Sequence, residues 1–471
     1  MINIVKNEIY KIFHKKSTFI ILIILIGFVL LTSIIYNSDS YDYYYSNLEY
    51  LEQTLKELEN NNGLIEDKIY YSTEIAVEKL LLEYEKNSWQ KDVIIKNYYD
   101  VANRYYHNYY NNLDTTEIEK EMQEFKKLLD NNNWKEFVIN DLNKIKDNLK
   151  DYENSLNSIS YQEKSSIEEQ IKILKNKIRL LNYRLENNVV LGNNYLSMAI
   201  DQNSEYLYHD VLAYEKSHEK ELESLENAVK TYYENEYILK EKVDINNSKS
   251  LYAILVNFFS EYEFLMFVFL IMIAGSIVSE EFSKGTIKSI LTIPHSRNKI
   301  LMGKYLSVLL MIPFIFIFLI IGEIVIGGLI LGFDSLTYPV ISYNIATASI
   351  NELSLFTYLV LLFITKLPKL VLLATLAFSI STILTSTSFA LAITFCGYLG
   401  AEIINAFALN YNLKFLDYFV TTNWDLSAFI FNNKTIFENS LSHSIIICII
   451  YLIIMLVISL IVFKKRNIKN I

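Results

Sequence analysis

A short charged segment between two long apolar runs holds the residues whose types and spacing indicate a function. Residues 279–307 read SEEFSKGTIKSILTIPHSRNKILMGKYLS, with an acidic pair, several basic side chains and the first proline of the chain. A basic loop between two membrane spans is expected to face the cytoplasm. In such a loop a membrane protein can receive mechanical work from a soluble partner.

Catalytic motifs are missing from the sequence. It contains no G-x-x-x-x-G-K-[ST], G-x-S-x-G or H-E-x-x-H pattern, and its six histidines are scattered. Cys396 and Cys448 both lie in apolar runs, which favours neither a disulfide framework nor a metal site. The net charge of −10 argues against a nucleic-acid partner. We therefore expect no enzyme, no catalytic or metal-ligating residue, and no cofactor bound by this chain.

Ionisable residues are few in and near the apolar runs. A charge at the bilayer centre costs ~2.5–3.5 kcal/mol or more, so those that occur usually face protein or water. Counting helical rise places Glu402 deepest and the other glutamates toward the outer interface. Two interpretations stay open: a polar outer vestibule on the translocation path, or snorkelling and local pairs with the two lysines. The residues are Glu261, Glu263, Glu323, Glu402, Lys366 and Lys369.

The apolar runs that must position these charges divide the 471 residues sharply. A hydrocarbon core of ~30 Å needs about 20 apolar residues, and residues 17–36 meet that length as a first span. Residues 37–250 are polar and residues 251–463 are mostly apolar. We expect one extracytoplasmic domain over 37–250 and a transmembrane domain with five further spans over 251–463.

The polar insert is expected to be helical. It has no proline and only two glycines, so helix breakers are scarce. Apolar residues recur at intervals of three and four within 48–58, 142–159 and 167–185, which predicts coiled-coil seams. With breaks near 60–63, 131–133, 187–194 and 246–250, the pattern predicts four or more long antiparallel helices.

The later spans are expected near 254–278, 305–331, 367–384, 389–409 and 444–463. Residues 332–352 lack Lys and Arg, which fits an outer loop. Residues 353–365 are apolar, but one helix from 353 to 384 would be about 48 Å long, too long for a single span. We therefore expect an outer interfacial helix over 353–365 and a bend at Pro368.

Both chain ends are basic. Residues 1–16 combine four lysines with apolar residues at helical spacing, which predicts an amphipathic helix in the headgroup plane. These lysines and the basic tail 464–471 place both termini in the cytoplasm. The expected fold is all-α: a multi-pass plasma-membrane protein with six transmembrane helices and a large, coiled-coil-like extracytoplasmic insert between the first and second spans.

Two segments carry a family resemblance. Residues 7–16, NEIYKIFHKK, lead into the first span, and residues 279–304 keep the order E…GT…P-x-S-R…K after the second. In both, the chain resembles the permease subunits of ABC transporters of the ABC type 2 class. The resemblance covers residues 1–36 and 251–471 and leaves out the insert.

This resemblance implies a permease that pairs with a second, identical or related permease in membrane lipid. ATPase subunits that carry ATP and Mg²⁺ would bind below, against a coupling helix at residues 284–291 with an apolar side. Proline disfavours helix in the residue before it, so the coupling helix would end at Pro294. The implied coupling residues are Glu280, Glu281, Lys284, Gly285, Thr286, Ile287, Ile290, Leu291, Pro294, Arg297 and Lys304.

We therefore expect the permease subunit of an ATP-driven ABC exporter; the family resemblance implies peptides, antimicrobials or amphiphilic compounds as substrates. Two alternatives remain. A membrane-anchored sensor could bind a ligand through the insert and signal through the same basic loop. A structural envelope protein would need no cytoplasmic partner.

Overall fold

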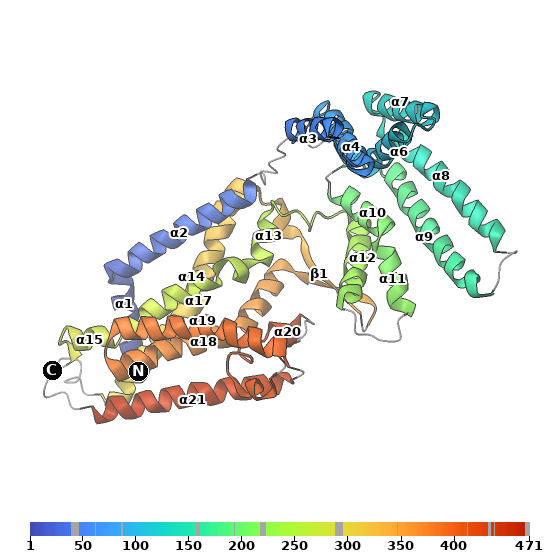
Figure 1. The fold of residues 1–471 in the computed structure, drawn as a ribbon. Helices are drawn as coiled ribbons and strands as arrows, with labels where there is room; N and C mark the ends of the chain where they lie inside the picture. Colours follow the sequence, from blue (N-terminus) through green and yellow to red (C-terminus); the bar gives the residue numbers. More distant parts are fainter. Residues whose placement is uncertain are drawn as a thin grey trace. The chain divides into compact units, whose positions relative to one another are not determined.

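The computed structural model describes residues 1–38, 47–61, 63–85, 88–156, 161–192, 194–216, 223–287, 295–345, 347–411, 413–431, 435–437 and 439–466. The chain divides into two compact units (Figure 1). We call residues 1–38, 247–340 and 352–471 the membrane unit, and residues 39–246 and 341–351 the insert unit.

Six helices of the membrane unit are long and apolar enough to cross a membrane, in the predicted number and order. A helix that is apolar on all sides has no solvent-facing stripe and needs lipid or protein around it. These helices therefore indicate a membrane protein. They are α2 (Lys16–Asn37), α14 (Phe258–Ser276) with the short α15 (Ser279–Ser283), α17 (Arg297–Leu331), α18 (Leu355–Leu384), α19 (Thr387–Tyr411) and α21 (Leu441–Lys465).

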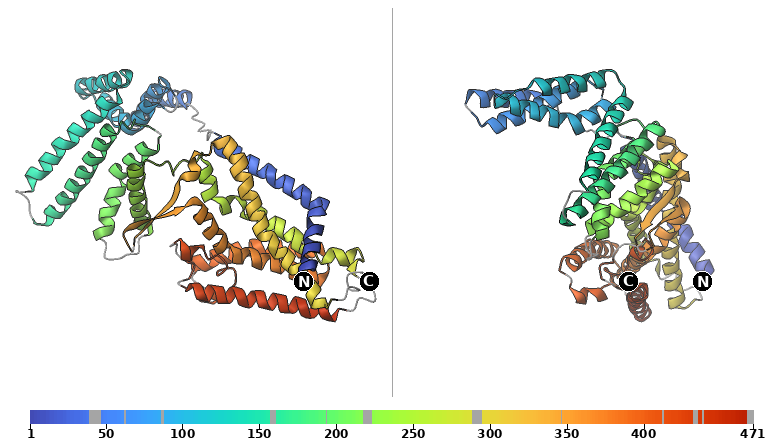
Figure 2. Two further views of the ribbon diagram at one scale, coloured as in Figure 1. Left: turned by 180° about the vertical axis from the view of Figure 1, so that it is seen from behind. Right: turned by 90° about the vertical axis from the view of Figure 1, so that its right-hand side faces the viewer.

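Helix α18 is central in the packing of this unit. It contacts α14, α19 and α21, while α2 and the N-terminal helix α1 (Ile2–His14) both pack on α17 (Figures 1 and 2). Tyr262, Phe267 and Phe378 are fully or almost fully buried between these helices. Small residues allow close approach: a Cβ on Gly303 would lie 2.6 Å from Ile4 Cγ2. The amphipathic α1 is therefore docked tightly against a membrane span.

Serine caps set where several of these helices begin. The Ser296 hydroxyl accepts from the Lys299 backbone N–H, so α17 begins at Arg297, well before the expected start at residue 305. Ser354 caps α18 in the same way. A capping side chain satisfies a backbone donor that the first helical turn leaves unpaired. The hydrophobic run alone therefore underestimated the length of α17.

The predicted division of this segment at Pro368 into two helices is wrong. Helix α18 is one helix of 30 residues with Pro368 inside it, and residues 355–365 are its first turns rather than a separate interfacial helix. Proline weakens the preceding turn by removing a hydrogen bond. The Thr365 carbonyl, in the turn before Pro368, also accepts from the backbone N–H of Leu426 at 3.1 Å. The expected second span is also divided, because Asn257 separates α13 (Leu251–Val256) from α14.

The described residues are almost entirely helical, as predicted, with one β-hairpin as an exception. Strands β1 (Pro339–Asn344) and β2 (Ser349–Ser354) pair within the expected outer loop, after the 3₁₀ turn η2 (Asp334–Thr337). Its tip belongs to the insert unit, where Tyr343 stacks on Tyr233 with ring centroids 4.3 Å apart. The sequence showed no clear period-2 alternation there, and tertiary contacts hold the hairpin.

The insert unit is built from many helices shorter than predicted. Helix α3 buries none of its residues, so the seam predicted over 48–58 is not buried in the described structure. The pair α8 and α9 comes nearest, packing around Val138, Leu142 and Leu181 (Figure 2). The helices are α3 (Leu48–Asn60), α4 (Ile65–Leu82), α5 (Trp89–Val93), the π-helical turn η1 (Ile94–Tyr98), α6 (Tyr99–Tyr110), α7 (Thr116–Asp130), α8 (Trp134–Ser155), α9 (Tyr161–Glu186), α10 (Tyr195–Glu205), α11 (Leu207–Lys216) and α12 (Glu223–Glu241).

Asparagine replaces glycine and proline as the helix breaker in this unit. Asn112, Asn132 and Asn188 have φ of +55°, +50° and +55°, directly after helices α6, α7 and α9. Asparagine tolerates the left-handed region better than other non-glycine residues. The scarcity of glycine and proline therefore did not imply long helices.

Candidate functional site

A network of buried ion pairs joins three elements at the end of the membrane unit that carries most of its basic residues. We call this the basic end; α1, α15 and the start of α17 meet there. Lys304 of α17 is 1% exposed. Its Nζ lies 3.0 Å from Glu8 Oε2 of α1 and 2.5 Å from Glu281 Oε1 of α15. One ammonium group therefore ties two helices to a membrane span.

Lys11 closes this network from the solvent side. Its Nζ lies 2.8 Å from Glu8 Oε1 and 3.4 Å from Glu281 Oε1. Burial lowers the pKa of Lys11, but the hydrogen bonds and charges of Glu8 and Glu281 outweigh that effect, and the net pKa is raised. Lys11 therefore stays charged over the physiological range. Glu281 Oε2 is buried and has no hydrogen-bond partner among the described residues.

A second set of contacts extends the network along α15. Lys15 pairs with Glu280, and its Nζ also donates to Ser276 Oγ at 3.1 Å. Lys284 Nζ lies 3.1 Å from Glu280 Oε2. Glu8 and Lys11 are three residues apart and share one face of α1, and Lys15 follows directly after the end of this helix. That face meets α15.

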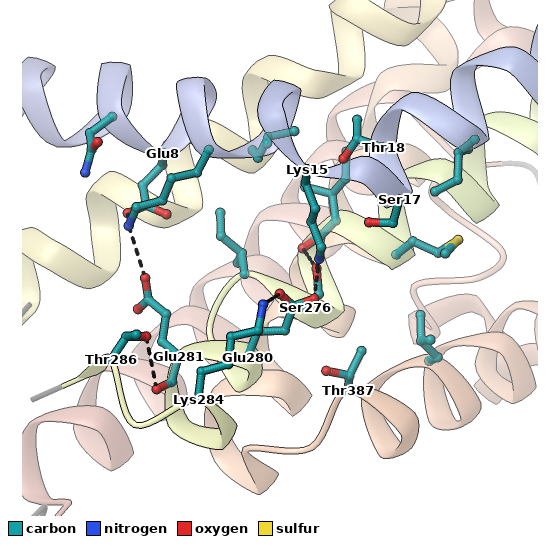
Figure 3. Close-up of a pocket in the computed structure, with 18 residues that line it drawn as sticks. Glu8, Lys15, Ser17, Thr18, Ser276, Glu280, Glu281, Lys284, Thr286 and Thr387 are labelled. Atoms are coloured by element: carbon teal, nitrogen blue, oxygen red, sulfur yellow. Dashed lines mark hydrogen bonds and ion pairs between the residues drawn. The ribbon is translucent and has the colours of Figure 1, made fainter.

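A cavity of about 840 Å³ opens beside this network (Figure 3). Figure 3 shows Glu8 of α1 and Lys15, which lies between α1 and α2, reaching down toward Glu280 and Glu281 on the facing segment. Charged side chains line one part of the cavity and apolar ones another, including Met272, Ile273 and Leu391. The cavity is therefore amphipathic.

The structure describes only part of the predicted coupling segment. Lys284 is the C-cap of α15 and Gly285 has φ +68°, so no helix begins at residue 284. Ile287 is fully buried, not on a free face. Thr286 Oγ1 donates to the Glu281 carbonyl at 3.4 Å. Ile290, Leu291 and Pro294 lie outside the residues that the structure describes.

Arg297 lies at the C-terminal end of this loop, where α17 begins. One of its guanidinium nitrogens donates to the Lys464 carbonyl at 3.1 Å and to the Arg466 carbonyl at 2.9 Å. Arg466 in turn donates to the carbonyls of Thr382 and Ile383 at the end of α18. The loop is thus fixed at both of its described ends, by ion pairs on one side and by backbone acceptors on the other.

The ionisable residues within spans form two further clusters. Glu323 is 0% exposed and accepts from Ser33 Oγ at 2.9 Å and from Tyr262 OH at 2.5 Å. Glu261 accepts from Tyr36 OH at 2.9 Å. Among the described residues Glu323 has no cationic partner within 4.0 Å, so neutral donors alone satisfy it.

The second cluster surrounds Lys369. Its Nζ lies 2.5 Å from Glu263 Oε1 and 3.3 Å from Glu402 Oε1, and 5.2 and 5.6 Å from the ring centroids of Tyr398 and Trp424. The structure therefore brings Glu263 and Glu402 together. Glu261 and Glu323 belong to the other cluster.

Lys366 adds a further pair at this cluster, with its Nζ 2.5 Å from Asp425 Oδ2. Burial alone would raise the pKa of Asp425. The charge and hydrogen bond of Lys366, with further bonds from Ser427, outweigh burial and hold that pKa below its usual range. A cavity of about 390 Å³ lies among these side chains.

Several residues of these clusters were not predicted. Glu8 and Lys11 had a usable signal, the common spacing on one helix face next to a basic segment, and Lys15 follows them in that segment. Asp425 and Trp424 had none, because they precede the short helix α20 (Ser427–Ile430) in an irregular segment that also contains the 3₁₀ turn η3 (Lys414–Tyr418). Ser33 and Tyr262 lie in apolar spans, and a single hydroxyl in an apolar run does not indicate which group it will bind.

A family model described as a protein of unknown function, DUF2705, matches residues 224–469, which is more than half of the chain. The chain belongs to this family. The matched residues run from α12 to α21 and include Glu281, Lys304 and the Lys369 cluster, but not α1 and α2.

A curated relative in this comparison is the uncharacterized protein YhcI of Bacillus subtilis (strain 168). It is 26% identical to this DUF2705 member over 252 residues, which are 53% of this chain and 80% of the relative. No solved structure matches the chain.

Proposed function

We propose that this chain is the membrane-spanning permease subunit of an ATP-driven ABC exporter, energised by a separate ATPase subunit at the basic end. The observation that carries the proposal is the position of Lys304 between Glu8 and Glu281. A force on the segment after α15 reaches α17 and α1 through short, buried ion pairs. A loop that served only to set topology would need basic residues but no such buried pairs.

The surroundings of this network support the same proposal. Lys284 and Gly285 are exposed at the start of the loop and are accessible to a soluble partner. In this arrangement the basic end faces the cytoplasm with both termini, the insert is extracytoplasmic, and ATP and Mg²⁺ bind to the partner. Large apolar side chains are exposed along α2, α19 and α21, which leaves surface for lipid and a second permease.

Purification of the intact chain from its native membrane, scored for bound proteins, tests the proposal. We expect an ATPase subunit in a stoichiometric complex. Deleting residues 287–291 should release the ATPase while the chain still resists alkaline extraction from the membrane, which serves as the control for insertion. An ATPase that remains bound at full stoichiometry after the deletion would refute the role of the loop. Recovery of a kinase instead of an ATPase would favour the sensor.

A further inference from the structure

The Lys369 cluster has the composition of a cation-binding site. Two carboxylates and two aromatic rings surround the Lys369 ammonium. Aromatic faces attract a cation through the ring quadrupole, and a desolvated site strengthens that attraction. Lys369 is 7% exposed and its own ammonium fills the position between these groups, so a further cation would bind beside it.

The side chains that line the cavity next to Lys369 carry more negative than positive charge. Its described lining contains the carboxylates of Glu263, Glu402 and Asp425 against the ammonium groups of Lys366 and Lys369, which leaves one negative charge in excess. The side chain of Glu402 is 58% exposed and is the least enclosed of the three carboxylates. The excess of carboxylates over ammonium groups favours a further cation, and Glu402 is the exposed carboxylate that such a cation would contact.

A hydrogen-bond acceptor without a donor, on Asn405, also favours a cation as the ligand. Asn405 Oδ1 is buried in the lining and has no hydrogen-bond partner among the residues that the structure describes. A buried acceptor without a donor costs free energy, which a ligand N–H would recover. A primary ammonium or guanidinium group offers such donors, whereas a quaternary ammonium group does not.

Apolar side chains in and beside the cavity fit a ligand that carries an apolar chain next to its charged group. Phe264 lines the cavity and is 45% exposed, and it lies 6.1 Å from the Tyr398 ring. Leu399 and Ile403 are 48% and 59% exposed on the same helix as Glu402. An apolar chain attached to the cation can lie along this surface. The cavity of about 390 Å³ itself accommodates the head and the first carbons of such a molecule.

We infer that this cavity binds the primary ammonium or guanidinium group of a cationic amphiphile, beside Lys369 and against Glu402 and Asn405. The inference rests on the proposed function, because it names the substrate class of the exporter. Binding to the purified chain needs no ATPase, however. Absence of the ATPase in the purification would therefore overturn the exporter and not this site, and absence of binding would overturn this site and not the exporter.

Calorimetric titration of the full chain in lipid nanodiscs tests the inference, with octylammonium as the probe. We expect one saturable site per chain. Octyltrimethylammonium, which has no N–H donor, and octyl sulfate, which has the opposite charge, should bind at least about tenfold more weakly, as expected for loss of a charge-assisted hydrogen bond. Equal binding of either molecule would overturn the inference.

Variants separate the site from general partition into the membrane. Glu402→Gln should weaken octylammonium binding about tenfold. Glu352→Gln removes an exposed carboxylate of β2 outside the cavity and should bind like the wild type. Asn405→Leu should weaken octylammonium but leave octyltrimethylammonium unchanged. Equal affinities of Glu402→Gln and Glu352→Gln would overturn the assignment.

Discussion

Replacing Lys304 by methionine tests the network at the basic end. The substitution keeps the length and the apolar part of the side chain but removes an ammonium group that is 1% exposed and lies between Glu8 and Glu281. Removing one partner of a buried ion pair destabilises by about 3–5 kcal/mol, because the other charge stays buried without compensation. Lys11 still contacts both carboxylates, so we expect the lower value, about 3 kcal/mol.

Thiol labelling of Cys448 measures this change. Cys448 is buried in α21 and Cys396 is exposed, so a Cys396→Ser background leaves one thiol that reacts only when the membrane unit opens. Titration with sodium dodecyl sulfate then gives the free energy of unfolding for each variant. Lys299→Met is the matched control, since Lys299 is exposed near the start of the same helix and should change stability by less than about 0.5 kcal/mol.

A compensating variant separates charge from packing. Adding Glu8→Gln and Glu281→Gln to Lys304→Met removes the uncompensated carboxylates. The triple variant should therefore regain most of the lost stability, because replacing a whole buried ionic group is often close to neutral. If Lys304→Met matches Lys299→Met, or if the triple variant is less stable than Lys304→Met, then the buried ion pairs are not what joins α1, α15 and α17.

Three further predictions concern other parts of the chain. The depressed pKa of Asp425 means that its pair with Lys366 stabilises fully above the usual value of 3.8 and is lost as the pH falls below it, so Asp425→Asn should flatten the acid limb of a pH–stability curve. Arg184 is fully buried against a carboxylate, so Arg184→Met should destabilise the insert by about 3 kcal/mol and speed hydrogen exchange in α9 and α10. Gly303→Ala should push Ile4 away and expose α1 to protease, and adding Ile4→Ala should restore protection.

Much of the membrane unit could be predicted from local patterns. Apolar length alone located the six candidate spans, because a helix that crosses the hydrocarbon core needs about 20 predominantly apolar residues. The boundaries were less certain, because caps such as Ser296 extend a helix into polar sequence that hydrophobicity does not mark. The bond from the Leu426 N–H to the Thr365 carbonyl of α18 joins residues 61 apart in the chain, so no local window could predict it.

The candidate sites show the same division. The sequence by itself determined which charged residues exist in and beside the spans, since a costly charge in an apolar run stands out against its neighbours. Only the tertiary structure decided their partners: Lys304 with Glu8 and Glu281, and Lys369 with Glu263 and Glu402. The physical reason is that apolar burial depends on composition along one helix. An ion pair instead depends on a few ångströms between atoms of different helices, and their register follows from packing that no single segment encodes.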